Sequence, residues 1–201
     1  MAKRGFDAVV SALGLVVSLP VWCVAALAVK LEDGGGVFYS QDRSGRGGRV
    51  FRVYKFRSMI QDAEAGVGAL QASAGDPRIT RTGRWLRATA MDELPQLWSI
   101  FIGDMSFVGP RALRPGEIEV QGDGRVVALE DVPGYALRAS VVPGLTGLAQ
   151  IYAPRDAPRR QKFRYDQLYI RRRSFGLDMR LIALSFWISL RGRWGARGRK
   201  F

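Results

Sequence analysis

The sequence predicts a mainly helical α+β protein whose N-terminal segment enters a membrane. The stretch from 8 to 29 is apolar and carries no charge. Residues 37–59 are rich in Val, Phe and Tyr on both sides of a glycine-rich turn, which is typical of a small β-hairpin. The later apolar residues fall mostly at helical spacing. We place the boundary of the membrane element at residue 33, so that residues 34–201 form the remaining domain.

The composition limits the chemistry that the chain can perform. Lys and Arg number 31 and Asp and Glu 18, and the net charge of +13 points to an anionic partner such as a nucleic acid, a phosphorylated substrate or an anionic lipid. The sequence contains no histidine, which excludes a Ser-His-Asp mechanism and a histidine-ligated zinc site. Cys23 is the single cysteine, so an intrachain disulfide is impossible.

The apolar stretch 8–29 admits three interpretations. As a straight helix it would be about 33 Å long, enough to cross a bilayer. A cleaved signal peptide fits the basic start and the small residues Ala26-Leu27-Ala28. In the third interpretation Pro20 breaks the helix near its middle, at a cost of about 3 kcal/mol, and two half-length helices enter and leave the same leaflet.

Positive charges flank both ends of this stretch, with Lys3 and Arg4 before it and Lys30 after it. Because positive flanks tend to stay in the cytoplasm, the pattern favours keeping both ends on that side. Proline is also tolerated in spanning helices, so these residues alone leave the re-entrant helix and the span open. A signal peptide fits less well because the segment that follows resembles a cytoplasmic domain.

The C-terminal part has the composition of an element at a membrane surface. Residues 159–175 alternate basic and aromatic residues, and residues 177–190 are strongly apolar. The tail after residue 190 carries four arginines, a lysine and Trp194. An apolar amphipathic helix with a basic tail suits an anionic membrane interface. A core helix followed by a basic tail fits the same residues.

Two adjacent carboxylates, Asp92 and Glu93, precede an apolar helix. Thr89 and Asp92 match a capping box, but that would place Pro95 at the sixth helical position, where proline removes a hydrogen bond. Proline is best placed at the first helical position, so we expect the helix to start at Leu94-Pro95. Asp92 and Glu93 then lie in the preceding turn and are free to face a cleft.

The helix after this pair is predicted to bury one face. Leu94, Leu97, Trp98 and Phe101 follow the spacing i, i+3, i+4 and i+7 of a buried stripe. A further short helix is expected at 117–121.

Basic residues surround the two carboxylates. Lys55 and Arg57 are two positions apart in a predicted strand and should share a face. Arg87 belongs to a basic stripe at three-residue spacing, and Arg111 follows a Gly-Pro turn. Cations favour the ionised form of a nearby carboxylate, which suits a metal ligand or a nucleophile. The residues themselves fit a phosphate-binding site and an ion-pair network equally well.

Four segments together resemble a known family. They read QDRSGRGGRVFRVYKFRSM, DPRITRTGRWLRATAMDELPQLWSIFIGDMSFVGPR, PGLTGLAQ and KFRYDQLYI. In this order they closely resemble the bacterial sugar transferase family, the monotopic phosphoglycosyl transferases that begin cell-surface glycan assembly. The resemblance runs from Lys3 to about Phe186. It is to the small catalytic-core form, similar in size to the bacillosamine-phosphate transferase of N-glycosylation.

The resemblance implies an activity. A sugar-1-phosphate would pass from a nucleotide diphosphate sugar, usually a UDP-sugar, to polyprenol phosphate, usually undecaprenyl phosphate, and UMP would leave. It also implies a covalent intermediate and a requirement for Mg²⁺. Residues 1–33 would form a re-entrant membrane helix broken at Pro20. Residues 34–201 would form a catalytic domain with an interfacial C-terminal helix, facing the cytoplasm at the inner leaflet of the cytoplasmic membrane.

The resemblance also implies roles for single residues. Asp92 would be the nucleophile and a Mg²⁺ ligand, with Glu93 as its partner, and an aspartyl-phosphate route agrees with the absence of histidine. The residues that would bind the substrate or its phosphates are Lys55, Arg57, Arg87, Arg111, Gln150 and Asp166.

Two other functions compete with this interpretation. A membrane-tethered basic protein that binds nucleic acid would show a steep salt dependence of binding and no response to Asp92→Asn. An ordinary nucleotide-sugar glycosyltransferase would release UDP instead of UMP. The family resemblance leads us to expect no nucleic-acid partner.

Overall fold

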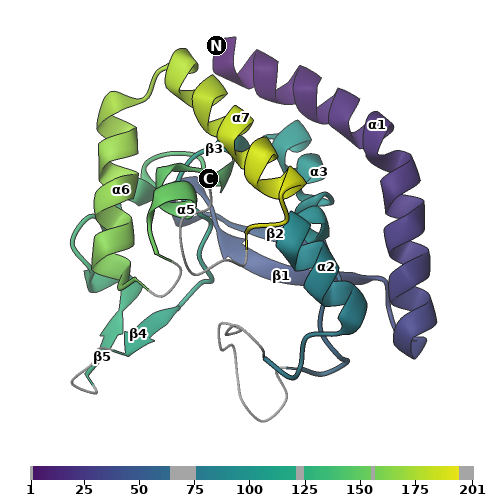
Figure 1. Cartoon of the computed structure of the whole chain (residues 1–201). Helices are drawn as coiled ribbons and strands as arrows, with labels where there is room; N and C mark the ends of the chain where they lie inside the picture. Colours follow the sequence, from purple (N-terminus) through teal and green to yellow (C-terminus); the bar gives the residue numbers. More distant parts are fainter. Residues whose placement is uncertain (1, 64–75, 121–124, 155–156, 195–201) are drawn as a thin grey trace.

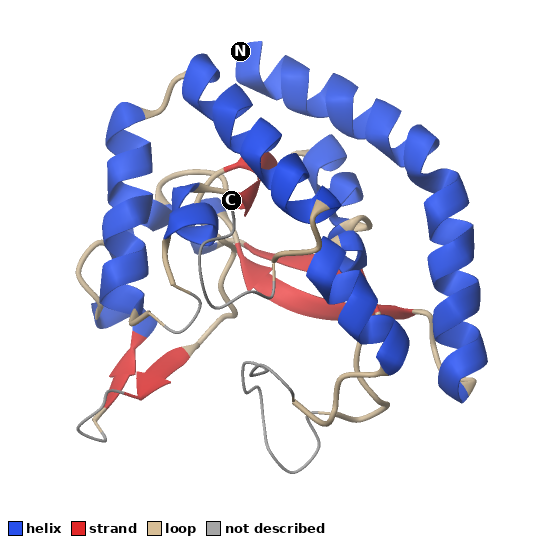
Figure 2. Ribbon diagram, in the orientation of Figure 1, coloured by secondary structure: helices blue, strands red, loops and turns tan. Residues whose placement is uncertain are grey.

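The computed structural model describes residues 2–63, 76–120, 125–154 and 157–194. Helices dominate this part of the chain (Figures 1 and 2), which confirms the predicted mainly helical α+β class. The helices are α1 (Ala2–Asp33), α2 (Arg81–Thr89), α3 (Gln96–Ile102), α4 (Tyr135–Ala139), α5 (Leu148–Tyr152), α6 (Arg159–Arg172) and α7 (Phe175–Leu190). Short 3-10 turns are η1 (Arg46–Gly48), η2 (Met91–Glu93) and η3 (Leu129–Asp131).

Within the described residues, three two-stranded sheets pack with these helices. The predicted hairpin is confirmed as β1 (Phe38–Ser44) paired antiparallel with β2 (Val50–Phe56), with Tyr39 opposite Lys55. Gly47 and Gly48 in its turn have φ of 67° and 80°, a left-handed conformation that glycine adopts without strain. β3 (Ser106–Val108) pairs in parallel with β6 (Gly144–Thr146). This pairing places two segments that are far apart in the sequence beside each other.

The helix expected at 117–121 is wrong, because this segment contains strand β4 (Ile118–Val120), paired antiparallel with β5 (Val126–Ala128). Glu117 and Glu119 both bind Arg159 at the start of α6. Glu119 lies in β4 and Glu117 directly precedes it, and their contacts with Arg159 connect this segment to the start of α6.

α1 is one continuous helix with Pro20 inside it, and Figure 1 shows that it bends in its middle. The structure therefore does not divide this stretch into two separate half-length helices. Proline removes one helical hydrogen bond and pushes against the preceding turn, which accounts for a bend. Among the described residues α1 is the one helix that is long and apolar enough to cross a membrane, with 17% of its most apolar window buried.

Part of the buried face predicted for α3 is wrong. Leu97 and Ile100 are buried, whereas Trp98 and Phe101 are 48% and 38% exposed. Ile100 lies in the core with Phe51 of β2. The rings of Trp98 and Phe101 contact each other on the outer side of α3, with centroids 5.7 Å apart.

The apolar core holds the turn with the two carboxylates in place. One cluster joins β2 and α3 through Phe51, Val53 and Leu97. A second joins α1 and α2 to Phe56, the end of β2. Leu94 packs against both clusters. Because Leu94 directly follows Glu93, this packing fixes η2 at the junction of the hairpin and three helices.

Candidate active site

Asp92 and Glu93 lie in η2, between α2 and α3, as the position of Pro95 predicted. α2 ends at Thr89, and Ala90 follows in a left-handed conformation with φ of 58°. The Thr89 hydroxyl donates to the Trp85 carbonyl at 3.0 Å, so it does not cap α3. Pro95 is the residue before the first helical position of α3. The carboxylates therefore project from a short turn.

Glu93 is held by two cations from distant segments. Its Oε1 accepts hydrogen bonds from Lys55 Nζ of β2 and from Arg111 Nη2, the latter at 3.2 Å. Burial opposes the ionisation of Glu93, but the charges of Lys55 and Arg111 outweigh it and hold its pKa well below the ordinary value. Glu93 is therefore ionised, and its charge fixes the positions of both cations.

Asp92 has a different environment. Its residue is 8% exposed, and no hydrogen bond or ion pair to its carboxylate occurs within the described residues. Burial raises the pKa of Asp92 to about 6, against the opposing charge of Lys55, and the adjacent charge of Glu93 raises it further. The sequence predicted that cations would favour the ionised form. The charges of Lys55, Arg87 and Arg111 do act in this direction, but desolvation outweighs them and the net pKa is raised. A pKa of about 6 still leaves the carboxylate mostly ionised at neutral pH.

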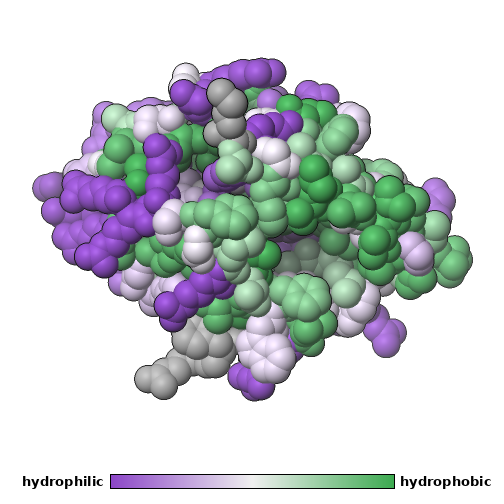
Figure 3. Space-filling view, turned by 90° about the horizontal axis from the view of Figure 1, so that it is seen from above, coloured by the Kyte–Doolittle hydropathy of each residue, from purple (hydrophilic) through white to green (hydrophobic). Residues whose placement is uncertain are grey.

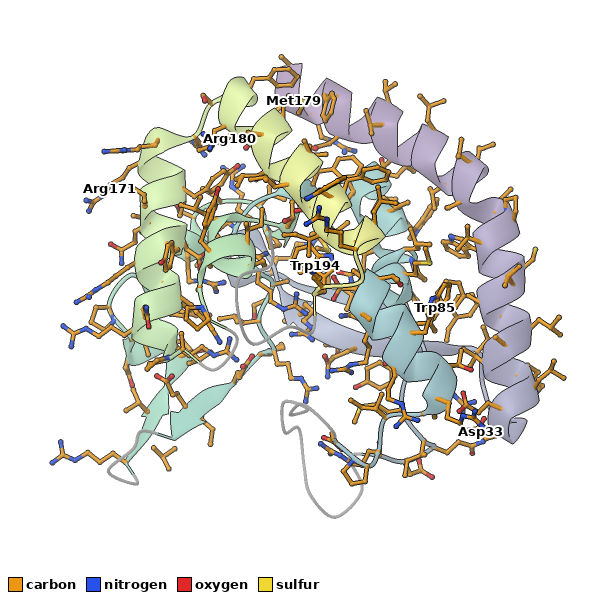
Figure 4. The ribbon with its side chains drawn as sticks, in the orientation of Figure 1. Asp33, Trp85, Arg171, Met179, Arg180 and Trp194 are labelled. Carbon is orange, nitrogen blue, oxygen red and sulfur yellow. The ribbon has the colours of Figure 1, made fainter. Side chains whose placement is uncertain are left out.

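The other two predicted phosphate-binding cations occupy different positions. The charge of Arg87, from the last turn of α2, favours the ionised form of Asp92, so Arg87 lies close enough to interact electrostatically with this carboxylate. Arg57 follows β2 and forms an ion pair with Asp33, which Figure 4 labels at the C-terminal end of α1. Arg57 Nη1 is buried without a hydrogen-bond partner in the described part of the chain. Lys55 and Arg57 thus bind different acids.

Asp166 reaches the site through a second arginine. Its Oδ2 accepts from Arg138 Nε at 3.2 Å, and Arg138 Nη2 donates to the backbone carbonyl of Arg111 at 2.5 Å. Arg138 also lies over the ring of Phe163, 4.6 Å from its centroid. Burial raises the pKa of Asp166 to about 6 against the opposing charge of Arg138. Asp166 is a buried residue of α6, and its ion pair with Arg138 is buried as well.

Gln150, in α5, contacts the same turn from another side. Its Nε2 lies 3.5 Å from the Gly109 carbonyl, two residues before Arg111. Gln150 thus contacts the backbone of the turn before Arg111, and Asp166 contacts the Arg111 carbonyl indirectly through Arg138. Both could hold Arg111 in place in addition to any contact with a substrate.

Sequence reasoning missed Arg43, Gln96 and Arg138. A small cavity beside η2 is lined by Arg43, Lys55, Gln96, Arg111 and Gly144 among others. Arg43 Nη1 donates to the Ala112 carbonyl at 3.1 Å. The Nε2 of Gln96 is buried without a hydrogen-bond partner among the described residues. Arg138 lies in a short helix outside the four recognisable segments, and no local pattern distinguishes it from surface arginines.

Comparison with known proteins identifies the family. The sequence profile of the bacterial sugar transferases matches residues 1–192. The chain belongs to the bacterial sugar transferase family. The resemblance found in the four sequence segments is thereby confirmed, and the chain is a transferase of this family.

Its relatives in the family include proteins of different length. The chain is 41% identical over 192 residues to the undecaprenyl-phosphate glucose phosphotransferase of Komagataeibacter xylinus. This match covers 92% of this chain and 35% of that protein. It is 37% identical over 198 residues to the UDP-N-acetylgalactosamine-undecaprenyl-phosphate N-acetylgalactosaminephosphotransferase of Aeromonas hydrophila. This match covers 97% of this chain and 45% of that protein. It is 40% identical over 185 residues to the exopolysaccharide production protein PSS of Rhizobium leguminosarum bv. phaseoli, covering 90% of both chains. The chain thus spans less than half of the first two relatives.

The residues at η2 are compatible with Mg²⁺. Within the described residues there is no group of three or more Asp, Glu, His or Cys side chains that could hold a metal ion by themselves. Mg²⁺, however, is commonly bound by one or two carboxylates together with substrate phosphates. Asp92, whose buried carboxylate has no direct contact with a cation in the described part of the chain, offers one such ligand.

Proposed function

We propose that this transferase moves a sugar-1-phosphate from a UDP-sugar to undecaprenyl phosphate or a similar polyprenol phosphate, with release of UMP. The observation that carries the proposal is the contrast within η2. Glu93 is neutralised by Lys55 and Arg111, whereas the adjacent Asp92 carboxylate is buried without a direct partner among the residues that the structure describes. A desolvated carboxylate close to several cations is suited to attack a negatively charged phosphorus centre. The names of the relatives support this class of substrates.

The reaction would proceed in two displacements at phosphorus. In the first, an oxygen of Asp92 attacks the phosphorus that bears the sugar, the bond from that phosphorus to the bridging oxygen breaks, and UMP leaves with the bond electrons. In the second, a phosphate oxygen of the polyprenol phosphate attacks the aspartyl-linked phosphorus, and the Asp92 carboxylate is released. Arg111 and Arg87 would bind and orient the phosphates by charge and by paired hydrogen bonds.

Mg²⁺ would be held by Asp92 together with the diphosphate of the donor. When bound, it would neutralise negative charge on the phosphates. Lys55 and Arg111 keep Glu93 ionised next to Asp92, so Glu93 cannot serve as a proton donor at neutral pH. The Asp166–Arg138 pair would position the Arg111 backbone.

The exposed apolar residues of three helices would contact the membrane. Those on α1 include Val17 and Leu31, each 76% exposed. α3 presents Ile102, and α7 presents Phe186 and Leu190. Figure 3 shows apolar residues gathered on the side where α1 lies, beside a region of hydrophilic residues. The bent α1 would enter and leave the inner leaflet, with α7 at the interface and the catalytic residues in the cytoplasm.

The released nucleotide tests the proposed function. Detergent-solubilised protein would be given UDP-glucose, UDP-N-acetylgalactosamine and other UDP-sugars in turn, with undecaprenyl phosphate and Mg²⁺. We expect UMP release that depends on one donor and is lost in Asp92→Asn. Release of UDP would instead indicate transfer of the sugar alone. Salt-sensitive binding of nucleic acid that survives Asp92→Asn would favour the nucleic-acid-binding alternative.

A further inference from the structure

A polar cluster joins the first turn of α1 to three later elements. Lys3 Nζ donates to the Val108 carbonyl of β3 at 3.0 Å, to the Tyr169 hydroxyl of α6 at 3.1 Å and to Asp178 Oδ2 of α7 at 2.5 Å. The Tyr169 hydroxyl also lies 2.8 Å from Asp178 Oδ1 and 3.1 Å from the Val108 carbonyl oxygen. Figure 4 shows Met179, the residue after Asp178, beside the N-terminal end of α1. Tyr169 and Asp178 are both buried.

The next two polar residues of α1 bind the same part of the chain. Arg4 Nη1 and Nη2 donate to the carbonyls of Ile100 and Phe101, at 2.7 and 2.5 Å. These carbonyls belong to the last turn of α3, where a cation also interacts favourably with the helix dipole. Asp7 is buried, and its Oδ1 accepts from the Phe107 backbone N–H at 3.3 Å. Three side chains of α1 thus hold the segment 100–108.

This segment connects the two halves of the candidate site. It follows η2 with Glu93 and precedes the turn with Arg111, and Glu93 and Arg111 bind each other. The path from Val108 to Arg111 is short and restrained. The Gly109 N–H donates to the Thr146 carbonyl at 2.9 Å, and the Pro110 carbonyl accepts from the Gly144 N–H at 2.8 Å. A displacement of Val108 would therefore be passed to Arg111.

We propose that Lys3 and Arg4 are positioning residues for Arg111, in addition to any part that their charge has in membrane topology. The proposal rests on the proposed function, because it assigns to Arg111 the binding of a donor phosphate. A flank that acts only through its charge needs no acceptors in the protein. Lys3 and Arg4, in contrast, together bind five partners in other elements, and Val108 is one of the partners of Lys3. The insertion of α1 and the geometry of the phosphate site are therefore coupled.

Lys30 provides the matched comparison. It flanks the other end of the apolar stretch, and its Nζ donates to the Gly34 carbonyl at 2.6 Å, next to its own helix end. Lys3→Met and Lys30→Met each remove one positive charge from a flank of the membrane helix. They differ in that Lys3→Met also removes the contacts with Val108, Tyr169 and Asp178, whereas Lys30→Met removes a contact next to its own helix end. If Lys3 acts only through its charge, both variants should lower kcat/KM for the UDP-sugar equally. If Lys3 positions Arg111, Lys3→Met should lower kcat/KM more than Lys30→Met.

The experiment is a double-mutant cycle on the full chain in detergent, with UMP release as the readout. Lys3→Met, Arg111→Ala and the double variant are compared in kcat/KM for the UDP-sugar. Hydrogen bonds to charged groups contribute enough that we expect Lys3→Met to lower kcat/KM by about tenfold. Because Lys3 acts through Arg111, it should cause less than about a twofold further loss in the Arg111→Ala background. Lys30→Met should lower kcat/KM by less than about twofold.

The KM values give a second readout that general loss of stability would not produce. We expect Lys3→Met to raise KM for the UDP-sugar while KM for undecaprenyl phosphate changes by less than about twofold. Should Lys3→Met fail to accumulate, Tyr169→Phe replaces it, since it deletes one hydroxyl that contacts both Lys3 and Val108. Its smaller loss, about threefold, should likewise be non-additive with Arg111→Ala.

Additive losses, or equal losses in Lys3→Met and Lys30→Met, would overturn the positioning role. Such a result would leave the proposed function intact as long as the wild-type chain releases UMP. Absence of UMP release by the wild-type chain with every donor would instead remove the proposed function itself. The two failures are therefore distinguishable.

Discussion

Asp92 and Glu93 are adjacent in η2, yet Glu93 Oε1 accepts from both Lys55 and Arg111 while the Asp92 carboxylate is buried without a direct partner in the described residues. The two pKa values therefore move in opposite directions: that of Glu93 is lowered and that of Asp92 is raised. Groups whose environments separate their pKa values in this way often have distinct roles at functional sites. This separation supports the proposal that Asp92 is the nucleophile and that Glu93 orders the cations.

Asp92→Asn should abolish turnover. The amide is nearly isosteric but a poor nucleophile, so we expect UMP release to fall by about 10⁴-fold or more. Asp104→Asn is the matched control, since Asp104 lies 3.7 Å from Arg49 in an ion pair outside the site. Retained UMP release in Asp92→Asn, with Asp104→Asn also active, would exclude Asp92 as the nucleophile.

The activity should depend on the protonation of Asp92. Attack requires the carboxylate, and its pKa is raised to about 6, so kcat/KM should rise with pH through about 6 and then level off. Asp166 also has a pKa raised to about 6, and Asp166→Asn separates the two. The rise should persist in Asp166→Asn with lower absolute rates. Its disappearance in that variant would assign the titration to Asp166.

Glu93→Gln should shift this pH dependence to lower pH. The charge of Glu93 is one cause of the raised pKa of Asp92, so removing the charge lowers that pKa and extends activity into more acidic solution. The rate on the plateau should also fall, because Lys55 and Arg111 lose the anion that orders them. An unchanged or higher midpoint would contradict the coupling between the two carboxylates.

Arginine substitutions should differ according to their partners. Arg111→Ala removes a cation at the site and should raise KM for the UDP-sugar by about 10- to 100-fold, in line with charge-assisted hydrogen bonds. Arg57→Ala should have a smaller effect on KM, since Arg57 binds Asp33 at the end of α1. A comparison of steady-state kinetics for the two variants tests this order. Equal increases in KM would show that Arg57 also contacts the donor.

The buried pair Asp166–Arg138 should contribute to stability as a unit. Asp166→Leu leaves the Arg138 charge buried without its acid and should lower the free energy of unfolding by about 3–5 kcal/mol. The double variant Asp166→Leu/Arg138→Met should recover much of that loss, because no uncompensated charge is left. Denaturant unfolding in detergent measures both. A double variant less stable than Asp166→Leu would indicate that Arg138 contributes chiefly through its bond to the Arg111 carbonyl.

Local rules predicted much of the fold from the sequence. The Val- and Tyr-rich segments around a glycine turn gave the β1–β2 hairpin, and Pro95 located the turn before α3. Periodicity failed where burial depends on distant elements. Trp98 and Phe101 have helical spacing, but α1 and β2 cover the other side of α3, and these two rings stay exposed. For Glu117 and Glu119 the strand is favoured by contacts with Arg159, which lies about forty residues later.

The sequence predicted the two acidic residues of the candidate site, but only some of its cationic residues. The Asp-Glu pair is visible because proline forces it out of the helix, and Arg111 follows a recognisable turn. Arg138 is positioned by Asp166 and the Arg111 carbonyl, both remote in sequence. The raised pKa of Asp92 also depends on burial, which residue spacing does not reveal. The contact between Lys3 and Val108 could not be predicted either, because the sequence identifies Lys3 only as a charge beside the apolar stretch.

The covalent intermediate on Asp92 is the central claim, and mass spectrometry tests it most directly. The protein would be incubated with the active UDP-sugar and Mg²⁺ without polyprenol phosphate, digested, and compared with Asp92→Asn. A sugar-phosphate adduct on the peptide with Asp92, formed together with UMP and absent from the variant, is the predicted result. UMP release with polyprenol phosphate but no adduct on Asp92 under any quench condition, or an adduct on another residue, would contradict it.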